Sequence, residues 1–228
     1  MITALVSHLV RQGTYGSEDI AVITPYLGQL QKIKKRLASS FEIVVGDRDQ
    51  EYLEAQGLQD DQETSGQVQV QKTILLNALR IATVDNFQGE EAKVIVVSLV
   101  RSNDKRKCGF LKTSNRINVL LSRARYEMYI IGNSHASWPV PMWDEVLSIL
   151  ERSNNIGPSL ALCCPRHKET PIEVSMPDDF AMFAPEGGCA GRCSSRLLCG
   201  HSCPNICHST SLHNAVRCLD RCPRIKKG

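Results

Sequence analysis

The sequence predicts an α/β fold, in which helices cover a parallel sheet, followed by a small irregular module rich in cysteine and histidine. Two observations lead to this prediction. Short apolar runs alternate with segments of helical periodicity up to residue 152, and nine of the ten cysteines lie between Cys163 and Cys222. Alternating strands and helices favour a parallel sheet. The second module is too small to bury much core, so we expect metal to stabilise it.

The chain begins with a predicted amphipathic helix. Apolar residues recur at helical spacing over residues 2–10, and Gly13 follows as a typical helix end. Residues 20–25, IAVITP, form a short apolar run closed by proline, which is typical of a strand buried on both faces. We expect an amphipathic helix over residues 27–37 and a second strand over residues 41–46, FEIVVG.

A polar stretch over residues 47–66, rich in Asp, Glu and Gln, interrupts this pattern and is interpreted as an insertion. The alternation then resumes, and residues 94–100, VIVVSLV, form the clearest buried strand. The same periodicities predict helices over residues 50–56, 70–79, 115–125 and 141–152 and strands over residues 81–84 and 126–133.

Regular periodicity ends near residue 152. We therefore expect one domain over residues 1–152, a linker over residues 153–160 and the cysteine/histidine module over residues 161–228. A net charge of +3 permits a polyanionic partner but indicates it only weakly. The apolar runs are far shorter than the roughly 20 residues that span a bilayer, and no basic stretch precedes the first one. The sequence thus predicts no membrane partner and no secretory signal.

Three polar clusters border the predicted strands, at residues 24–29, 83–91 and 115–125. Chemistry in a parallel sheet sits at the carboxyl ends of the strands, so we expect all three clusters at that edge. The segments ITPYLGQ, TVDNFQGEEAKVIVVSLVRSN, GFL and NRINVLLSRAR carry them. In their order and spacing they resemble the second RecA-like lobe of superfamily-one helicases of the up-frameshift type. The resemblance covers about residues 1–133 and implies a P-loop-NTPase-type sheet.

The resemblance also implies roles for individual residues. Arg123 matches the arginine finger, a planar permanent cation that reaches the γ-phosphate during phosphoryl transfer; a surface salt bridge is the alternative. Implied nucleotide-binding residues are Gln88, Gly89, Glu91, Arg116 and Arg123. Implied nucleic-acid-binding residues are Thr24, Thr83, Asp85 and Asn118. A carboxylate at a helix N-terminus is the alternative for Glu91, and helix or turn capping is the alternative for Thr83 and Asp85.

The sequence contains no Gly-x4-Gly-Lys-Ser/Thr loop and no acidic pair that ends a strand before this lobe. The residues that cradle ATP and hold Mg²⁺ are therefore expected in a first helicase lobe that this chain lacks. We expect the chain to be a fragment or a truncated gene model, and we expect it to hydrolyse no ATP by itself.

The second module has the ligand types and spacing of a zinc-binding segment. Thiolates and imidazoles at short intervals can close a tetrahedral shell around Zn²⁺, and disulfides or free thiols are the alternatives. The candidate ligands are Cys164, His167, Cys189, Cys193, Cys199, His201, Cys203, Cys207, His208, Cys218 and Cys222. The first four could close one site, and Cys199, His201, Cys203 and Cys207 could close another, although order along the chain does not fix the connectivity.

The stretch CGHSCPNICHS resembles the cysteine/histidine-rich repeats of X-box-binding-type zinc fingers. Only Gly200 separates Cys199 from His201, and STSLH replaces the Gly and Cys that usually follow. That departure makes His208 and His213 competing ligands.

Together, the two modules resemble helicases with X-box-type zinc fingers found with small-RNA silencing machinery, most of all the fungal branch. The resemblance implies an ATP-dependent helicase on single-stranded RNA or DNA in heterochromatin formation, with an RNA-directed RNA polymerase complex as partner. We expect an intracellular protein, nuclear rather than cytoplasmic. One alternative is a non-enzymatic fragment that binds RNA or protein through zinc. A ubiquitin ligase is another, although the spacing of a RING domain is missing.

Overall fold

The computed structural model describes residues 1–58, 78–100 and 109–218. The contacts divide the chain into two compact units. The sheet unit consists of Ile2 and Gly16–Ile156, and the cysteine-rich unit consists of Met1, Thr3–Tyr15 and Gly157–Gly228. Each unit is described by itself below.

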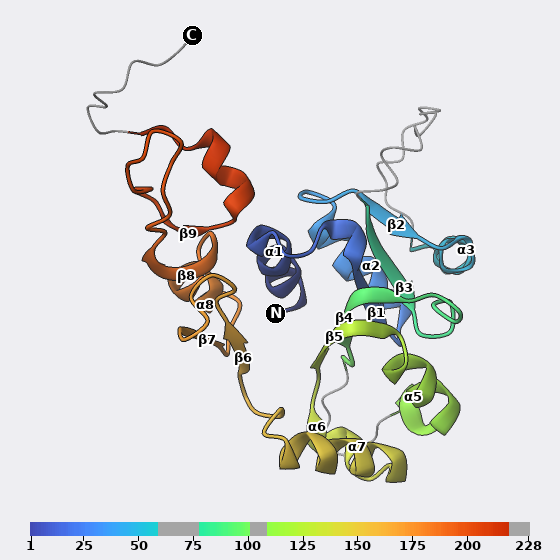
Figure 1. Ribbon diagram of the computed structural model, residues 1–228. Helices are drawn as coiled ribbons and strands as arrows, with labels where there is room; N and C mark the ends of the chain where they lie inside the picture. Colours follow the sequence, from blue (N-terminus) through green and yellow to red (C-terminus); the bar gives the residue numbers. More distant parts are fainter. Residues whose placement is uncertain (59–77, 101–108, 219–228) are drawn as a thin grey trace. The chain divides into compact units, whose positions relative to one another are not determined.

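The sheet unit is built on five parallel strands in the order β2-β3-β1-β4-β5. All five are visible near the centre of Figure 1, and their bounds are Ile20–Thr24 for β1, Ile43–Val45 for β2, Leu79–Thr83 for β3, Ala92–Ser98 for β4 and Ala124–Ile131 for β5. Every residue of β1 is buried, and so are the last five residues of β4, as their continuous apolar runs predict. The predicted RecA-like α/β arrangement is confirmed.

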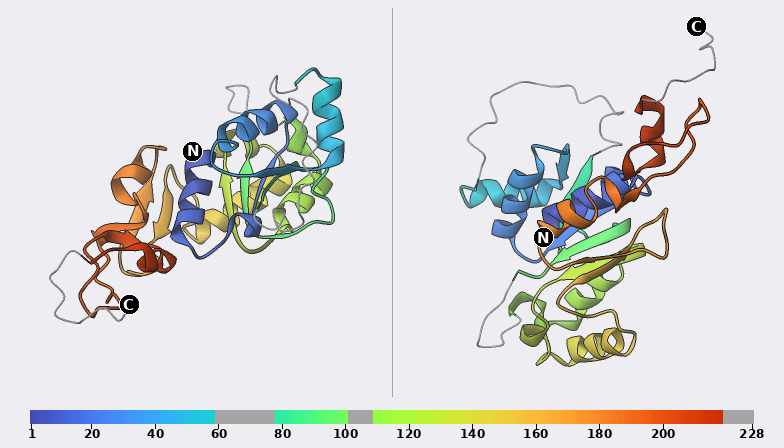
Figure 2. Two further views of the ribbon diagram at one scale, coloured as in Figure 1. Left: turned by 90° about the horizontal axis from the view of Figure 1, so that it is seen from above. Right: turned by 90° about the vertical axis from the view of Figure 1, so that its left-hand side faces the viewer.

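Helices cover both faces of this sheet (Figure 2). Helix α2 (Leu27–Leu37) lies against one face and buries the apolar stripe that the sequence predicts. Helices α5 (Ser114–Leu121) and α7 (Pro141–Arg152) lie against the other face, and Trp143 is fully buried in the core between α7 and the sheet. Short helical segments complete the unit: η1 (Ser17–Asp19), α3 (Asp47–Ala55), η2 (Gly109–Lys112) and α6 (Ser134–Ser137).

Two sequence-based boundaries are wrong, and each has a local cause. The helix predicted over residues 115–125 ends at Leu121, because Ala124 already pairs with Ala92 of the neighbouring strand. The backbone N–H of Ala92 also donates to the carbonyl of Arg123 at 3.1 Å, which fixes Arg123 just before β5. The helix predicted over residues 70–79 lies mostly outside the described residues, and its last residue, Leu79, begins β3.

The cysteine-rich unit contains more regular structure than its sequence suggests. It has two antiparallel strand pairs, a short helix α8 and a helical turn η3, and it includes the first helix of the chain. Their bounds are Ile2–Gln12 for α1, Leu160–Cys163 for β6, Pro171–Val174 for β7, Asp179–Phe183 for α8, Gly187–Arg192 for β8, Ile206–His208 for β9 and Thr210–Ala215 for η3. Among the described residues, every helix is too short or too polar to cross a lipid bilayer.

Helix α1 ends as predicted at Gly13, which has a left-handed φ of 72°. The sequence-based boundaries place α1 in the domain over residues 1–152, whereas the contacts group residues 3–15 with the cysteine-rich unit. Arg166 donates from its guanidinium to the carbonyl of Gln12 at 3.0 Å, and the rings of His8 and Phe180 lie 4.9 Å apart. A Cβ on Gly187 would collide with the backbone of Arg11. These contacts are long-range in sequence, so helical periodicity could not reveal them.

Candidate functional site

The first two polar clusters begin at one edge of the sheet. Parallel pairing places Thr24 of β1 beside Thr83 of β3 and Ile23 beside Val97, so that three strands end at the same level. At this carboxyl edge Gln29 donates to the hydroxyl of the buried Ser98 at 3.3 Å. Thr24 is fully buried, and its hydroxyl has no partner among the described residues.

Residues 84–91, called here the crossover segment, lead from the carboxyl end of β3 to the amino end of β4. Phe87 anchors its middle in the hydrophobic core. Near its end Glu90 forms a two-pronged ion pair with Arg80, with distances of 2.6 and 3.0 Å. The segment therefore touches both edges of the sheet, and not only the carboxyl edge that the sequence predicts.

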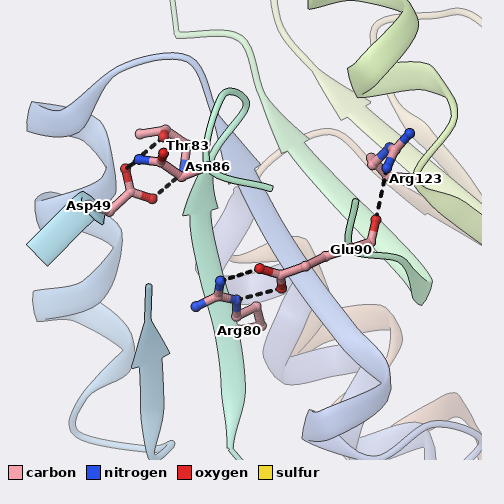
Figure 3. A network of polar contacts seen from close by, with 6 residues as sticks. All are labelled: Asp49, Arg80, Thr83, Asn86, Glu90 and Arg123. Atoms are coloured by element: carbon pink, nitrogen blue, oxygen red, sulfur yellow. Dashed lines mark hydrogen bonds and ion pairs between the residues drawn. The ribbon is translucent and has the colours of Figure 1, made fainter. Parts of the chain in front are cut away.

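Arg123 lies at the opposite, amino edge, directly before β5. This corrects the expectation that all three polar clusters share the carboxyl edge, because α5 runs from one edge to the other. The Arg123 guanidinium donates to the carbonyl of Glu90 at 3.2 Å (Figure 3). It also donates to the carbonyl of Val119 at 2.8 Å and to the Ser122 hydroxyl at 2.7 Å. Arg123 and the turn over residues 88–91 are thus brought together.

The other predicted residues divide between the two edges. Glu91, at the amino edge, pairs with Arg125 at 2.9 Å, and both side chains are half-exposed, so the pair contributes little to stability. Gly89 has a φ of +86°, a conformation that favours glycine in the turn before Glu91. Gln88 is exposed beside it.

Arg116 lies in the first turn of α5 and pairs with Asp85 at 3.2 and 3.3 Å. Arg116, which the resemblance implies to bind nucleotide, is therefore next to Asp85, which it implies to bind nucleic acid. Arg123 follows the other end of the same helix. Asn118 is exposed on α5.

Sequence reasoning missed a fully buried carboxylate in this region. Asp49 of α3 is 0% exposed and accepts hydrogen bonds from Thr83 and Asn86. A polar pocket of about 660 Å³ opens beside it, and its lining includes Arg48, Asn86 and Glu90. Asp49 is the second acidic residue in an insertion full of acidic residues, and nothing in its spacing distinguishes it.

In the described part of the cysteine-rich unit, seven cysteines and four histidines form three groups. Within each group the ligand atoms lie within 4.8 Å of one another. The groups are Cys164, His167, Cys189 and Cys207; Cys193, Cys203, His208 and His213; and Cys199, His201 and Cys218. They are called the first, second and third metal groups below.

Several spacings within these groups fit zinc, and other ligand pairs lie closer, down to 3.0 Å between Cys193 Sγ and Nε2 of His213. Tetrahedral Zn²⁺ with bonds of about 2.3 Å to sulfur and about 2.0 Å to nitrogen separates its ligand atoms by about 3.5–3.8 Å. In the first group Cys164 Sγ lies 3.6 Å from Cys207 Sγ and 3.8 Å from Nδ1 of His167. In the third group Cys199 Sγ lies 3.6 Å from Nδ1 of His201. The first two groups offer four ligands each, which is the number that structural zinc sites use.

Local structure favours the thiolate form that a metal requires at Cys164 and Cys199, whereas burial raises the pKa of the Cys203 and Cys207 thiols. Burial raises the pKa of the Cys164 thiol, but hydrogen bonds from backbone N–H groups, led by that of Cys189, outweigh burial and lower the pKa to about 6. The backbone N–H of His201 contributes most to lowering the pKa of Cys199 to about 7. A Cβ on Gly188 would overlap Sγ of Cys207, so glycine is required for the close approach in the first group.

The ligand sets differ from those suggested by order along the chain. Cys193 does not join Cys164, His167 and Cys189; the buried Cys207 takes its place. Chain order fails because β8 and β9 pair antiparallel and bring Cys207 back beside Gly188. His213 is left out of the candidate ligands because His208 competes with it. In the structure both histidines belong to the second group.

Cys222 lies outside the described residues. Cys163, the neighbour of Cys164, is exposed and belongs to none of the three groups.

Comparisons with known proteins bear on both units. Residues 1–135 match the family described as AAA domain. NFX1-type zinc finger-containing protein 1 of Mus musculus is 46% identical over 148 residues, 64% of this chain. Its homolog in Caenorhabditis elegans is 34% identical over 230 residues, 98% of this chain. The helicase required for RNAi-mediated heterochromatin assembly 1 of Schizosaccharomyces pombe is 40% identical over 79 residues, 34% of this chain.

The chain spans 8% of the length of each of these three relatives. The AAA match nevertheless covers more than half of the chain, and relatives named as helicases are similar to it over 146 and 79 residues. The chain therefore belongs to the AAA domain family and carries a superfamily-one helicase-type lobe.

Proposed function

We propose that this chain is the C-terminal part of an ATP-dependent helicase that moves along single-stranded RNA or DNA and acts in RNA-mediated silencing. The observation that carries the proposal is the contact between Arg123 and the crossover segment, at an edge of a parallel sheet. The printed name of the Schizosaccharomyces pombe relative supports the silencing role. Nuclear localisation and an RNA-directed RNA polymerase complex as partner are further parts of the proposal.

In this proposal Arg123 is the arginine finger. Its guanidinium has five N–H donors, more than its three acceptors among the described residues, Glu90, Val119 and Ser122, engage. Donors therefore remain for a phosphate oxygen. ATP with Mg²⁺, held by the first lobe, supplies the phosphoryl group. Glu91, Gln88 and Gly89 form the turn beside Arg123 and face the same nucleotide.

The opposite end of the crossover segment contacts nucleic acid. Asp85 lies there and is held by Arg116, and Thr83 directly precedes the segment as the last residue of β3. Thr24 and Asn118 belong to the same proposed interface. Because one short segment carries residues for both ligands, a shift on nucleotide binding at one end changes the position of the other end. The segment is thus the proposed coupling element between hydrolysis and movement.

The cysteine-rich unit is a zinc-binding module for nucleic acid or protein in this proposal. The three metal groups and the names of the two NFX1-type relatives support it. The alternative is a zinc-dependent binding fragment without ATPase activity.

The test is the Arg123→Ala variant of the full-length protein that contains this chain, compared with Arg125→Ala. Arg125 also carries a cationic side chain but pairs with Glu91 at the surface. An arginine finger contributes about 10³–10⁵-fold to the hydrolysis rate. RNA-stimulated ATP turnover and strand displacement should therefore collapse only in Arg123→Ala, with RNA affinity unchanged. Equal activity of the two variants would show that Arg123 is not the finger.

The isolated 228-residue chain should show no ATP turnover. RNA-stimulated hydrolysis by this chain alone would contradict the assignment of the phosphate cradle to another lobe.

A further inference from the structure

Asp49 stands out as a carboxylate that is removed from solvent and has no role in the proposed reaction. It is 0% exposed, although it lies in the first turn of α3, where its neighbours Asp47 and Arg48 are exposed. An isolated carboxylate in such a place would be costly to bury, so its stability depends on the donors around it. Figure 3 shows the side chain directed toward the end of β3.

Three donors converge on this carboxylate. The backbone N–H of Thr83 donates to one oxygen at 2.8 Å, and the Thr83 hydroxyl donates to the other at 2.6 Å. Asn86 donates its side-chain amide to that second oxygen at 2.6 Å. Hydrogen bonds to an ionised group are shorter and stronger than neutral ones. Together they fix the backbone at Thr83 and the side chain of Asn86 at the start of the crossover segment.

Asn86 also lines the polar pocket beside α3, together with Asp85 and Gln88, whereas Asp49 does not line it. Asp49 therefore acts through Asn86 and Thr83 and not on a ligand directly. We propose that Asp49 is a positioning residue, which holds the start of the crossover segment in the geometry that engages nucleic acid. This inference rests on the proposed function of that segment.

The test compares Asp49→Asn with Glu51→Gln in the full-length protein. Both changes neutralise one acidic residue of α3, but Glu51 is exposed. The asparagine amide cannot accept from all three donors at once. Misplacing one charge-assisted hydrogen bond is expected to raise the RNA concentration for half-maximal ATPase stimulation by roughly tenfold. The KM for ATP should stay within about twofold, since the hydrogen bonds of Asp49 go to Thr83 and Asn86 and not to the residues proposed to bind nucleotide.

A double substitution separates positioning from general destabilisation. Asp49→Asn combined with Asn86→Asp returns a carboxylate to the same cluster and should recover most of the RNA response. Hydrogen exchange at Thr83–Asn86 in the 228-residue chain reports the same defect without any activity assay. It should accelerate in Asp49→Asn and not in Glu51→Gln.

The outcomes are distinguishable. If Arg123→Ala abolishes turnover while Asp49→Asn leaves the RNA response unchanged, the positioning role is wrong and the proposed function stands. Tighter RNA binding by Asp49→Asn would also overturn the role, because the carboxylate would then compete with phosphate for Thr83. If the unmodified full-length protein shows no RNA-stimulated ATPase, the proposed function itself fails.

Discussion

Substitution of Cys207 by serine should remove the first metal group and unfold the cysteine-rich unit. Cys207 is fully buried, and its Sγ lies 3.6 Å from that of Cys164. It also accepts a hydrogen bond from Arg166, the residue that donates to the end of α1. Loss of this thiolate therefore affects both a zinc ligand set and the attachment of α1.

The size of the effect follows from what the unit buries. Five of the fourteen buried hydrophobic residues in the described part of this unit are cysteines that belong to the metal groups, so candidate metal ligands make up about a third of its core. A structural zinc ion contributes about 10–16 kcal/mol in small zinc-binding domains, and a whole domain is stable by about 5–15 kcal/mol. Loss of one zinc site therefore removes more free energy than the remaining packing supplies.

The assay is native mass spectrometry for zinc content together with hydrogen exchange of residues 2–12. Cys163→Ser is the matched control, because Cys163 is exposed and belongs to no metal group. The wild-type chain and the control should each hold one zinc ion for every metal group. Cys207→Ser should hold at least one fewer, and α1 should exchange rapidly. Unchanged zinc content in Cys207→Ser, or a loss in Cys163→Ser, would refute the ligand assignment.

Three further predictions concern the same unit. Arg166→Gln, which removes the contacts to Cys207 and Gln12, should destabilise the unit by about 2 kcal/mol in urea unfolding while zinc content is retained; unchanged stability would contradict the tie to α1. Burial lowers the pKa of His8 from 6.5 to about 4, helped by Arg11 and Arg166. The neutral ring therefore makes its full contribution to the free energy of unfolding above pH 6.5, and this contribution is lost as the pH falls toward 4. The free energy of unfolding should fall by about 3 kcal/mol more over that range in the wild-type chain than in His8→Gln, and parallel pH profiles would disprove this. Gly188→Ala should lower zinc affinity at the first group only, measured by competition with a chelator, because the added methyl group overlaps Cys207; wild-type affinity would show that the close approach is not required.

The sheet was predictable because its strands follow from local patterns. β1 and β4 are continuous apolar runs, and α7 has the bounds that its periodicity and its initial proline predict. The start of β5 was not predictable in the same way. It depends on pairing between Ala92 and Ala124, which are far apart in the chain.

The candidate sites likewise combine features that the local sequence reveals with features that depend on contacts between distant segments. Arg123 was singled out by its motif, and the structure places its guanidinium in contact with the carbonyl of Glu90. Which edge of the sheet it occupies depends on the direction of α5, which polarity alone does not reveal. Zinc ligand types were evident from spacing, but the partition into groups depends on the pairing of β8 with β9, which brings Cys207 back to Cys164. Nothing in the sequence near Asp49 distinguishes it, because its proposed role depends on contacts with Thr83 and Asn86, which are distant in the chain.

The central claim is that Arg123 stabilises charge that develops on a nucleotide held by another lobe. A finger of this kind acts in the transition state and not in the ground state. The most direct measurement is the affinity of the full-length protein for ADP with and without aluminium fluoride, which mimics the transferring phosphoryl group. In Arg123→Ala, affinity for the aluminium fluoride complex should fall by at least about 10³-fold while affinity for ADP stays unchanged. Equal affinities of Arg123→Ala and the wild-type protein for that complex would contradict the claim.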